Sequence, residues 1–128
     1  GAYFEITTPD LWQEAVQVLL AAWMRTHAEQ HFSKRLTAWK PWCEYRKLPE
    51  PRLYLRAMPK RWGSSHRDGR IYLNPDLVRA PSVCVDYVIV HEICHLQHPK
   101  HNRFFYELLS EMFPDWQVVK LRLEQAEL

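Results

Sequence analysis

The stretch that decides the fold is residues 82–97, which read SVCVDYVIVHEICHLQ. It is long and mostly apolar, and Ser82 is a suitable N-terminal cap. His98-Pro99 follows and ends it, because the residue before a proline is driven out of the helical region. We therefore predict one strong helix over this stretch. Within it, residues 91–95 read HEICH and form an HExxH motif.

The HExxH motif predicts a metal site. His91 and His95 are four residues apart on one helical face, so both imidazoles can reach a single ion. Glu92 lies beside them, where it can hold a metal-bound water and take its proton as a general base. Zn²⁺ lowers the pKa of such a water to about 7. Cys94 points away by about a quarter turn or more, and we expect it to be buried rather than a ligand. The alternative is a solvated helix face that carries these residues by accident.

A catalytic zinc binds three protein ligands and keeps one open position. His98 would line up with the first two histidines in a row, which suits a tetrahedron poorly, so we predict a rim position for it. His101 lies beyond His98-Pro99, where the chain can turn and approach from a new direction, and we predict His101 as the third ligand. Metzincins use the same spacing with a glycine at the turn, but here His98 stands at that place. The alternative for His101 is a surface or capping histidine.

Outward from this helix the pattern predicts short strands. Apolar and polar residues alternate from about residue 52 to 57, and residues 61–65 and 70–73 are short extended runs. Asp68-Gly69 between those runs predicts a hairpin turn. On the other side, we expect a helix from about Asn102, its cap, to Met112, and a last helix from 116 to about 126 capped by Asp115.

The N-terminal third predicts two helices. Thr8 can cap the first, from Pro9 to about His27, and a second is expected over about 33–46 although Pro41 lies within it. The first helix carries a stripe that we expect to be buried, made of Leu11, Ala15, Leu19, Ala22 and Trp23. The fold class is therefore α+β, with N-terminal helices, a small antiparallel sheet, the HExxH helix and C-terminal helices. We predict a single domain over 1–128, with N-terminal helices at about 9–46 and a catalytic core at about 51–128.

Composition narrows the class of protein. The 128 residues are 47% hydrophobic and 25% charged, which is typical of a globular chain and excludes wholesale disorder. The formal net charge of +2 is too weak to argue for nucleic acid by itself. No apolar run approaches the length of about 20 residues that a membrane span needs, and no signal peptide is evident. Three cysteines without a CxxC pair favour a reducing, cytoplasmic location. Because the chain starts with Gly1 and not Met, the natural chain can begin further upstream.

Several segments together resemble the YgjP-like metallopeptidase domain, a small gluzincin-like group related to SprT-like proteins. They are RWGSS at 61–65, IYLN at 71–74, DYVIVHEICHL at 86–96, His101 and Phe104-Phe105. The resemblance runs from about Arg52 to Trp116. It implies a zincin fold, a third histidine ligand at His101 and a catalytic glutamate at Glu92. The family's RWGSC segment ends here in Ser65, and better-known members carry a longer N-terminal region.

A cleft should lie beside the metal. In zincins the strand before the active-site helix lines the cleft and pairs with extended substrate, so we expect Trp62, Gly63 and Ser64, or residues 71–73, to form that edge. Trp62 is equally compatible with a place in the core, and Phe104-Phe105 is expected to be core beneath the site. A donor must also stabilise the oxyanion of the transition state. The candidates, among which the sequence does not choose, are Tyr106, His98, His66 and Arg61.

The leading hypothesis is a zinc-dependent metallopeptidase that hydrolyses peptide bonds with a metal-activated water. One alternative is a zinc-dependent nucleotide pyrophosphatase with Arg61, Arg67 and Arg70 on the phosphates, although no Walker loop and no carboxylate cluster for Mg²⁺ is present. Another is a non-enzymatic zinc- or DNA-binding module, since basic and aromatic residues interleave over 34–52. We expect a peptide or protein as substrate and no membrane partner, with nucleic acid only weakly supported.

Overall fold

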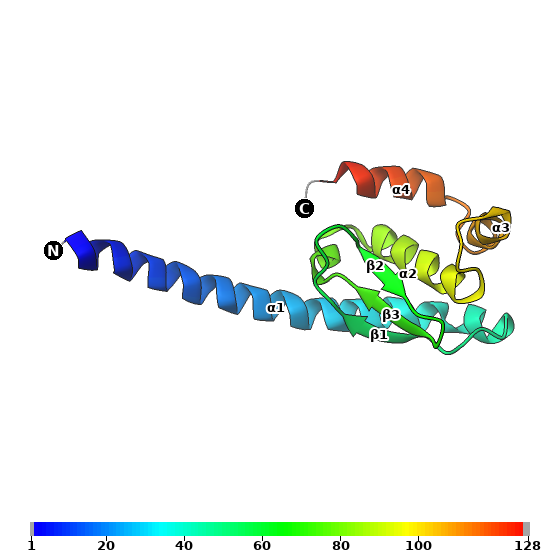
Figure 1. Cartoon of the computed structure of the whole chain (residues 1–128), viewed down its shortest axis with the longest axis horizontal. Helices are drawn as coiled ribbons and strands as arrows, with labels where there is room; N and C mark the ends of the chain where they lie inside the picture. The colour runs from blue at the N-terminus through cyan, green and yellow to red at the C-terminus, as the bar shows by residue number, and fades with distance from the viewer. Residues whose placement is uncertain (1, 127–128) are drawn as a thin grey trace.

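The computed structural model describes residues 2–126, with side chains described from residue 10 onward. Its central element is α2 (Ser82–Gln97), as predicted. This helix packs against a small sheet on one side and against the other helices elsewhere, so it is buried over most of its length (Figure 1). Its N-terminal cap is Pro81, and Ser82 does not cap it. The Ser82 hydroxyl instead contacts His31 Nε2 at 3.3 Å, because the neighbouring helix lies beside this end of α2.

The sheet is small and mixed. β1 (Arg52–Leu55) and β2 (Gly63–Ser65) flank β3 (Arg70–Leu73), which is the middle strand. β2 and β3 are antiparallel and joined at the predicted Asp68-Gly69 turn, where Gly69 has a φ of +103°. β1 and β3 are parallel, so the prediction of a wholly antiparallel sheet was wrong. The chain reverses once after β1 and again after β2, and strand periodicity carries no information about such pairing. Beyond β3 follows a short 3-10 helix, η1 (Pro75–Arg79).

The N-terminal third forms one long helix, α1 (Ala2–Tyr45), and not two. Residues 28–32 contain neither glycine nor proline, and Ala28 and Phe32 are fully buried against the core, so nothing breaks the helix there. Pro41 lies within the helix on its exposed side. The predicted start at Pro9 was also wrong, since the helical backbone begins earlier. The Thr8 side chain, the predicted cap, lies outside the described residues.

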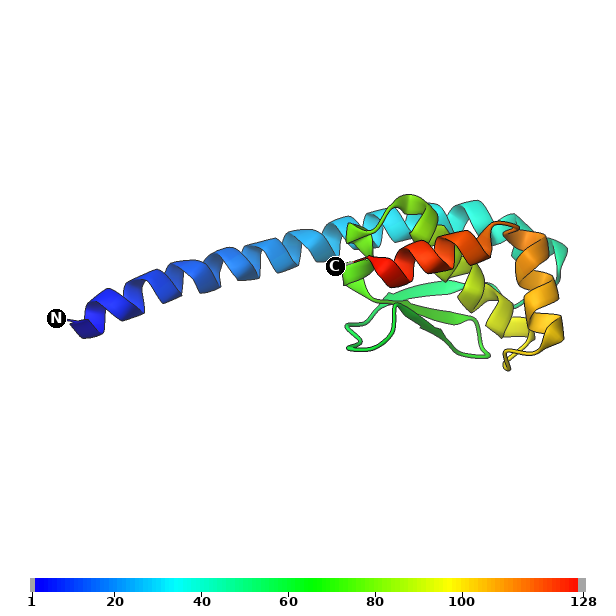
Figure 2. The same ribbon diagram turned by 90° about the horizontal axis from the view of Figure 1, so that it is seen from above.

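The first half of α1 extends away from the body of the molecule (Figures 1 and 2). The stripe predicted to be buried there is exposed: Leu11 is 60%, Leu19 70% and Trp23 63% accessible, and Ala15 and Ala22 are also exposed. Apolar spacing identifies the face of a helix that favours burial, but it does not say whether the body of the protein reaches that face.

The C-terminal helices cover α2 from the side opposite the sheet (Figure 1). α3 (Arg103–Met112) begins as predicted at Asn102, whose side-chain oxygen accepts a hydrogen bond from the Phe105 amide at 3.2 Å. α4 (Trp116–Gln125) packs its buried Val119 and Leu123 inward. Asp115 is its N-cap residue, as predicted, although the Asp115 side chain makes no capping hydrogen bond. Within residues 2–126, no helix is long and apolar enough to cross a membrane.

Candidate metal centre

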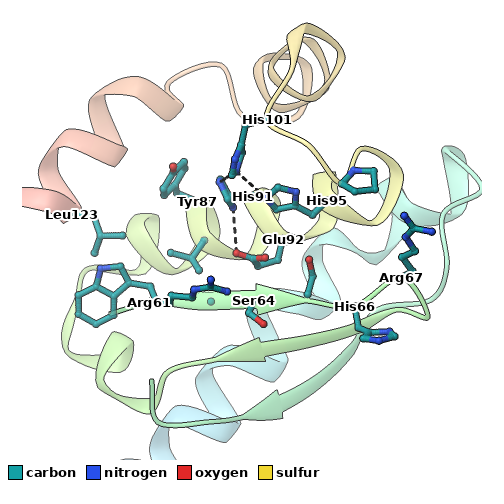
Figure 3. Close-up of a pocket in the computed structure, with 15 residues that line it drawn as sticks. Arg61, Ser64, His66, Arg67, Tyr87, His91, Glu92, His95, His101 and Leu123 are labelled. Atoms are coloured by element: carbon teal, nitrogen blue, oxygen red, sulfur yellow. Dashed lines mark hydrogen bonds and ion pairs between the residues drawn. The ribbon is translucent and has the colours of Figure 1, made fainter. Parts of the chain in front are cut away.

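Three imidazoles converge at the surface of α2 (Figure 3). His91 and His95 come from α2, and His101 comes from the loop before α3. His101 Nε2 lies 2.9 Å from His95 Nε2 and 3.3 Å from His91 Nε2. One nitrogen of each residue lies within 4.8 Å of the other two, so the three can hold a single metal ion.

Local sequence explains how His101 reaches this point. α2 ends at Gln97 with His98 as its cap, and the chain reverses within a few residues before Asn102 caps α3. Phe105, one turn into α3, is fully buried behind the imidazoles. Its ring centroid lies 4.5–5.1 Å from those of all three histidines, so it forms an apolar backing for the cluster. The core position predicted for Phe104-Phe105 holds for Phe105, whereas Phe104 is 52% exposed.

In His91 and His95, the ring nitrogen Nδ1, which is not the one that faces the cluster, has a hydrogen-bond acceptor nearby. His95 Nδ1 lies 3.1 Å from the backbone oxygen of His98, and His91 Nδ1 lies 3.2 Å from Glu92 Oε2. Donation from Nδ1–H to these oxygens leaves a lone pair on Nε2, the nitrogen that faces the cluster. His98 thus contributes to the site through its backbone carbonyl oxygen, which orients the His95 ring. Its own ring stacks on Phe104 at 6.2 Å.

The cluster fits a tetrahedral cation. His101 Nε2 lies 2.9 and 3.3 Å from the Nε2 atoms of His95 and His91, and ring nitrogens that face one another this closely repel unless a proton or a cation lies between them. A zinc ion with bonds of about 2.0–2.1 Å places its nitrogen ligands about 3.3 Å apart, close to these spacings. Burial lowers the pKa of His95 and of His101, and this favours the neutral form that binds metals.

The histidines open into a cleft of about 740 Å³. The segment 61–67, which contains β2, forms one wall, and α2 forms the other (Figure 3). The Glu92 carboxylate lies at the floor, with the residue 5% exposed. Trp62, Gly63 and Ser64 line this cleft as predicted, and of the candidate oxyanion donors so do Arg61 and His66.

The other two candidate oxyanion donors are Tyr106 and His98. The Tyr106 ring stacks on Trp116 with centroids 5.4 Å apart and lies 6.3 Å from the His101 ring, whereas His98 lines a separate, smaller hollow beside Phe104. Neither belongs to the residues that line the cleft. Tyr87 lines it and was missed. The signal was available, since Tyr87 is four residues before His91 and therefore on the same helical face.

The basic and aromatic stretch over 34–52 is largely engaged in internal contacts. Arg35 forms two hydrogen bonds with Asp86 of α2, at 2.7 and 2.9 Å, and Arg46 pairs with Glu111 of α3. Trp39 and Trp42 pack against the core. These contacts attach α1 to α2, and the residue that follows α1 to α3.

In a comparison with known protein families, the YgjP-like metallopeptidase domain matches residues 3–126. The chain belongs to this family. The match includes nearly all of α1, so it extends well beyond the segments that carry the sequence resemblance. Membership makes this YgjP-like protein a metallopeptidase, a hydrolase that acts on peptides or proteins.

Solved structures share the fold of this YgjP-like domain. The metallopeptidase zymogen of Pyrococcus abyssi abylysin is 18% identical, with a TM-score of 0.61 over 72% of this chain and 90% of that chain. The metallopeptidase zymogen of Methanocaldococcus jannaschii jannalysin is 16% identical, with a TM-score of 0.57 over 77% of this chain and 94% of that chain. The α+β fold predicted from the sequence is confirmed. No curated protein sequence matches this chain.

Proposed function

We propose that this protein is a zinc-dependent peptidase in which His91, His95 and His101 bind the ion and Glu92 is the general base. The observation that carries the proposal is the convergence of three Nε2 atoms beside a carboxylate at the floor of one cleft. Three imidazole ligands with an open fourth position are typical of catalytic zinc. A zinc ion bound there would lower the pKa of a coordinated water to about 7 and would polarise the substrate carbonyl.

Glu92 is suited to proton transfer. Its carboxylate faces the cleft next to the first histidine, and its Oε2 accepts the bond from His91 Nδ1, which holds the group in place. In the proposed reaction it takes the proton of the attacking water and passes it to the leaving nitrogen, as a general base and then a general acid. Removing such a group slows a reaction by about 10²–10⁴-fold.

The cleft provides a place for an extended substrate. β2 is an edge strand that pairs with β3 among the described residues, and its other edge lies along the cleft. A substrate backbone added beside Ser64 would form main-chain hydrogen bonds and lie across the histidines. We further propose that residues 1–128 form one catalytic domain, because buried Ala28 and Phe32 of α1 share a core with α2. A cytoplasmic location stays a prediction.

The test measures metal and activity on the same sample. The chain is purified without a metal-affinity step, its metal content is measured by elemental mass spectrometry, and cleavage of unfolded proteins is followed. We expect about one zinc per chain and cleavage that a chelator abolishes and added zinc restores. Stoichiometric zinc without peptide cleavage, together with nucleotide hydrolysis, would instead support a pyrophosphatase. Absence of metal after dialysis against zinc would reject the site.

A further inference from the structure

Two arginines in the cleft wall pair with no carboxylate of the part of the chain that the structure describes. Arg61 precedes β2 and Arg67 follows it; both line the cleft and both are exposed. In the close-up, Arg61 and Arg67 lie toward opposite ends of the cleft, with the histidine cluster between them in this view (Figure 3). Among the ion pairs of the described residues, neither guanidinium takes part.

The backbone that carries Arg61 is firmly held. Buried Asn74 donates from its side chain to the carbonyl oxygens of Met58 and Arg61, at 2.7 and 3.2 Å. Its backbone N–H donates to the carbonyl of Trp62 at 2.9 Å. These hydrogen bonds hold the backbone before and after Arg61. A backbone that is already held lowers the entropic cost of binding a ligand there.

The backbone near Arg67 is held as well. The turn after β2 is closed by hydrogen bonds from His66 N to Arg70 O, at 2.9 Å, and from Gly69 N to His66 O, at 3.0 Å.

Asp68 is the carboxylate adjacent to Arg67, but Arg70 donates to it at 2.9 Å. It also lies within ion-pair distance of Arg52 and His66. This acid is therefore shared among other cations and does not neutralise Arg67.

The charge of the cleft is consequently positive. Glu92 is the acidic residue that lines it, and this carboxylate is nearly buried and bonded to His91. We propose that Arg61 and Arg67 bind carboxylate groups of the substrate, so that this peptidase prefers acidic peptides. The inference rests on the proposed peptidase function and concerns the same cleft. A guanidinium matches a carboxylate with two parallel hydrogen bonds, which favours this ligand over a neutral amide.

The carboxylate can come from two sources. It can belong to Asp or Glu side chains on either side of the scissile bond, or to the C-terminus of the substrate. Peptides of one sequence with Glu or Gln near the cleavage point, each with a free or an amidated C-terminus, separate the two. Dependence on Glu alone indicates side-chain recognition, and dependence on the free C-terminus indicates recognition of a chain end.

The kinetic test uses these peptides on the zinc-loaded chain. Because both arginines are solvent-exposed, we expect a moderate effect of about fivefold in kcat/KM for each carboxylate that is engaged. The advantage should shrink at about 0.5 M salt, which screens exposed charges. If all four peptides are cleaved equally well, the inference is wrong even though the peptidase function stands.

Variants assign the effect to residues. Arg61→Gln and Arg67→Gln should each lower kcat/KM for acidic peptides more than for neutral peptides, whereas Arg61→Glu should turn the preference toward lysine-containing peptides. Arg79→Gln is the matched control, because Arg79 is an exposed arginine outside the cleft with no ion pair among the described residues. If Arg61→Gln lowers cleavage of acidic and neutral peptides equally, it serves the reaction itself, and the recognition role assigned to it is overturned.

A binding measurement keeps the inference testable without turnover. Fluorescent versions of the same peptides are titrated into Glu92→Gln, alone and combined with each arginine variant. Acidic peptides should bind about fivefold more tightly, and Arg61→Gln or Arg67→Gln should remove the difference. A preference that survives both arginine variants would place the carboxylate on the metal and reject the inference. A binding preference without cleavage by the parent chain would reject the peptidase function and leave the arginine sites standing.

Discussion

Gly63 of β2 lies directly against Glu92 of α2. A Cβ atom on Gly63 would lie 3.2 Å from both Cγ and Oε2 of Glu92, and 2.8 Å from Cγ1 of Val88. Real Cβ atoms essentially never approach another atom as closely as the 2.8 Å to Val88. Glycine at this place therefore lets the edge strand approach the active-site helix, and it gives the cleft its narrow floor beside the carboxylate.

Gly63→Ala should damage both stability and activity. Val88 is buried and β-branched, so its side chain cannot easily rotate away, and the strand must shift instead. We expect a loss of about 1–3 kcal/mol in the free energy of unfolding, as for other overpacked sites, measured by urea denaturation. Peptide cleavage should fall further than stability explains, because the shift moves the wall beside Glu92.

A double variant separates the steric effect from other causes. Val88→Ala alone should destabilise by leaving a cavity, but it also removes the methyl group that Gly63→Ala strikes. The double variant should therefore lose less stability than the sum of the two single losses. Additive losses would show that the contact between Gly63 and Val88 does not control the approach of β2.

Glu92→Gln should keep the metal and lose hydrolysis. The amide is nearly the same size as the carboxylate but cannot accept the proton of the attacking water. We expect about 10²–10⁴-fold slower cleavage with unchanged zinc content. Equal loss of zinc and activity would mean that Glu92 supports the site structurally, and unchanged activity would contradict its role as the base.

His101→Ala and His98→Ala form a matched pair. Both remove a histidine from the loop region after α2, but only the His101 ring faces the cluster, since His98 contributes its backbone oxygen to His95. We predict that His101→Ala lowers zinc affinity severely and that His98→Ala retains about one zinc per chain. Isothermal titration with zinc measures both, and circular dichroism checks that each variant is folded.

The sequence predicted the parts of this molecule that depend on local rules. The apolar run before His98-Pro99 predicted α2. The break after it led us to expect the His101 ring, and not the His98 ring, near His91 and His95, and the His101 ring lies there. Gly63 was expected at the cleft, but its contact with Glu92 depends on how closely two elements pack, and no local pattern contains that distance.

Predictions failed where non-local arrangement decides. The parallel pairing of β1 with β3 follows from the path of the chain around β2, not from strand periodicity. Leu19 and Trp23 have the spacing of a buried stripe, but α1 carries them beyond the body. Tyr106 follows the buried Phe105, and helical geometry turns its ring toward Trp116, so it lies near the His101 ring without lining the cleft.

The cysteines should be unreactive in the folded protein. Burial raises the pKa of Cys94 to about 12 and that of Cys43 to about 11, and it also raises the pKa of Cys84. The thiolate is the reactive form, so at about pH 8 a thiol reagent should label all three cysteines slowly and label them fast in urea. Fast labelling of a native thiol would contradict the burial of that residue.

The same shifts predict a loss of stability in alkali. Below the ordinary cysteine pKa of 9.0 the thiols are neutral in both states and the shifts have no effect. Above it, thiols ionise in the unfolded chain while Cys94 and Cys43 stay neutral in the folded one. Ionisation therefore stabilises the unfolded state relative to the folded state. Stability should fall as the pH rises from about 9 toward 11–12, and Cys94→Ala should reduce that fall, as urea denaturation at each pH will show.

Removing residues 1–20 should leave the fold intact. Residues 10–20 are exposed throughout, and the buried part of α1 begins at Ala28. We therefore expect a change of less than about 0.5 kcal/mol in the free energy of unfolding, with unchanged zinc binding. Solubility should rise, because the deletion removes a contiguous apolar surface that includes Leu11 and Leu19.

A longer deletion provides the contrast. Removing residues 1–32 also takes away Ala28 and Phe32, which are fully buried in the common core. Loss of a buried phenylalanine alone costs about 3–5 kcal/mol, a large share of the total stability of a small domain, so this chain should no longer unfold cooperatively. A strong drop in the unfolding midpoint after the shorter deletion would show that the first half of α1 packs against another surface in solution. That result would contradict the exposure of its apolar face.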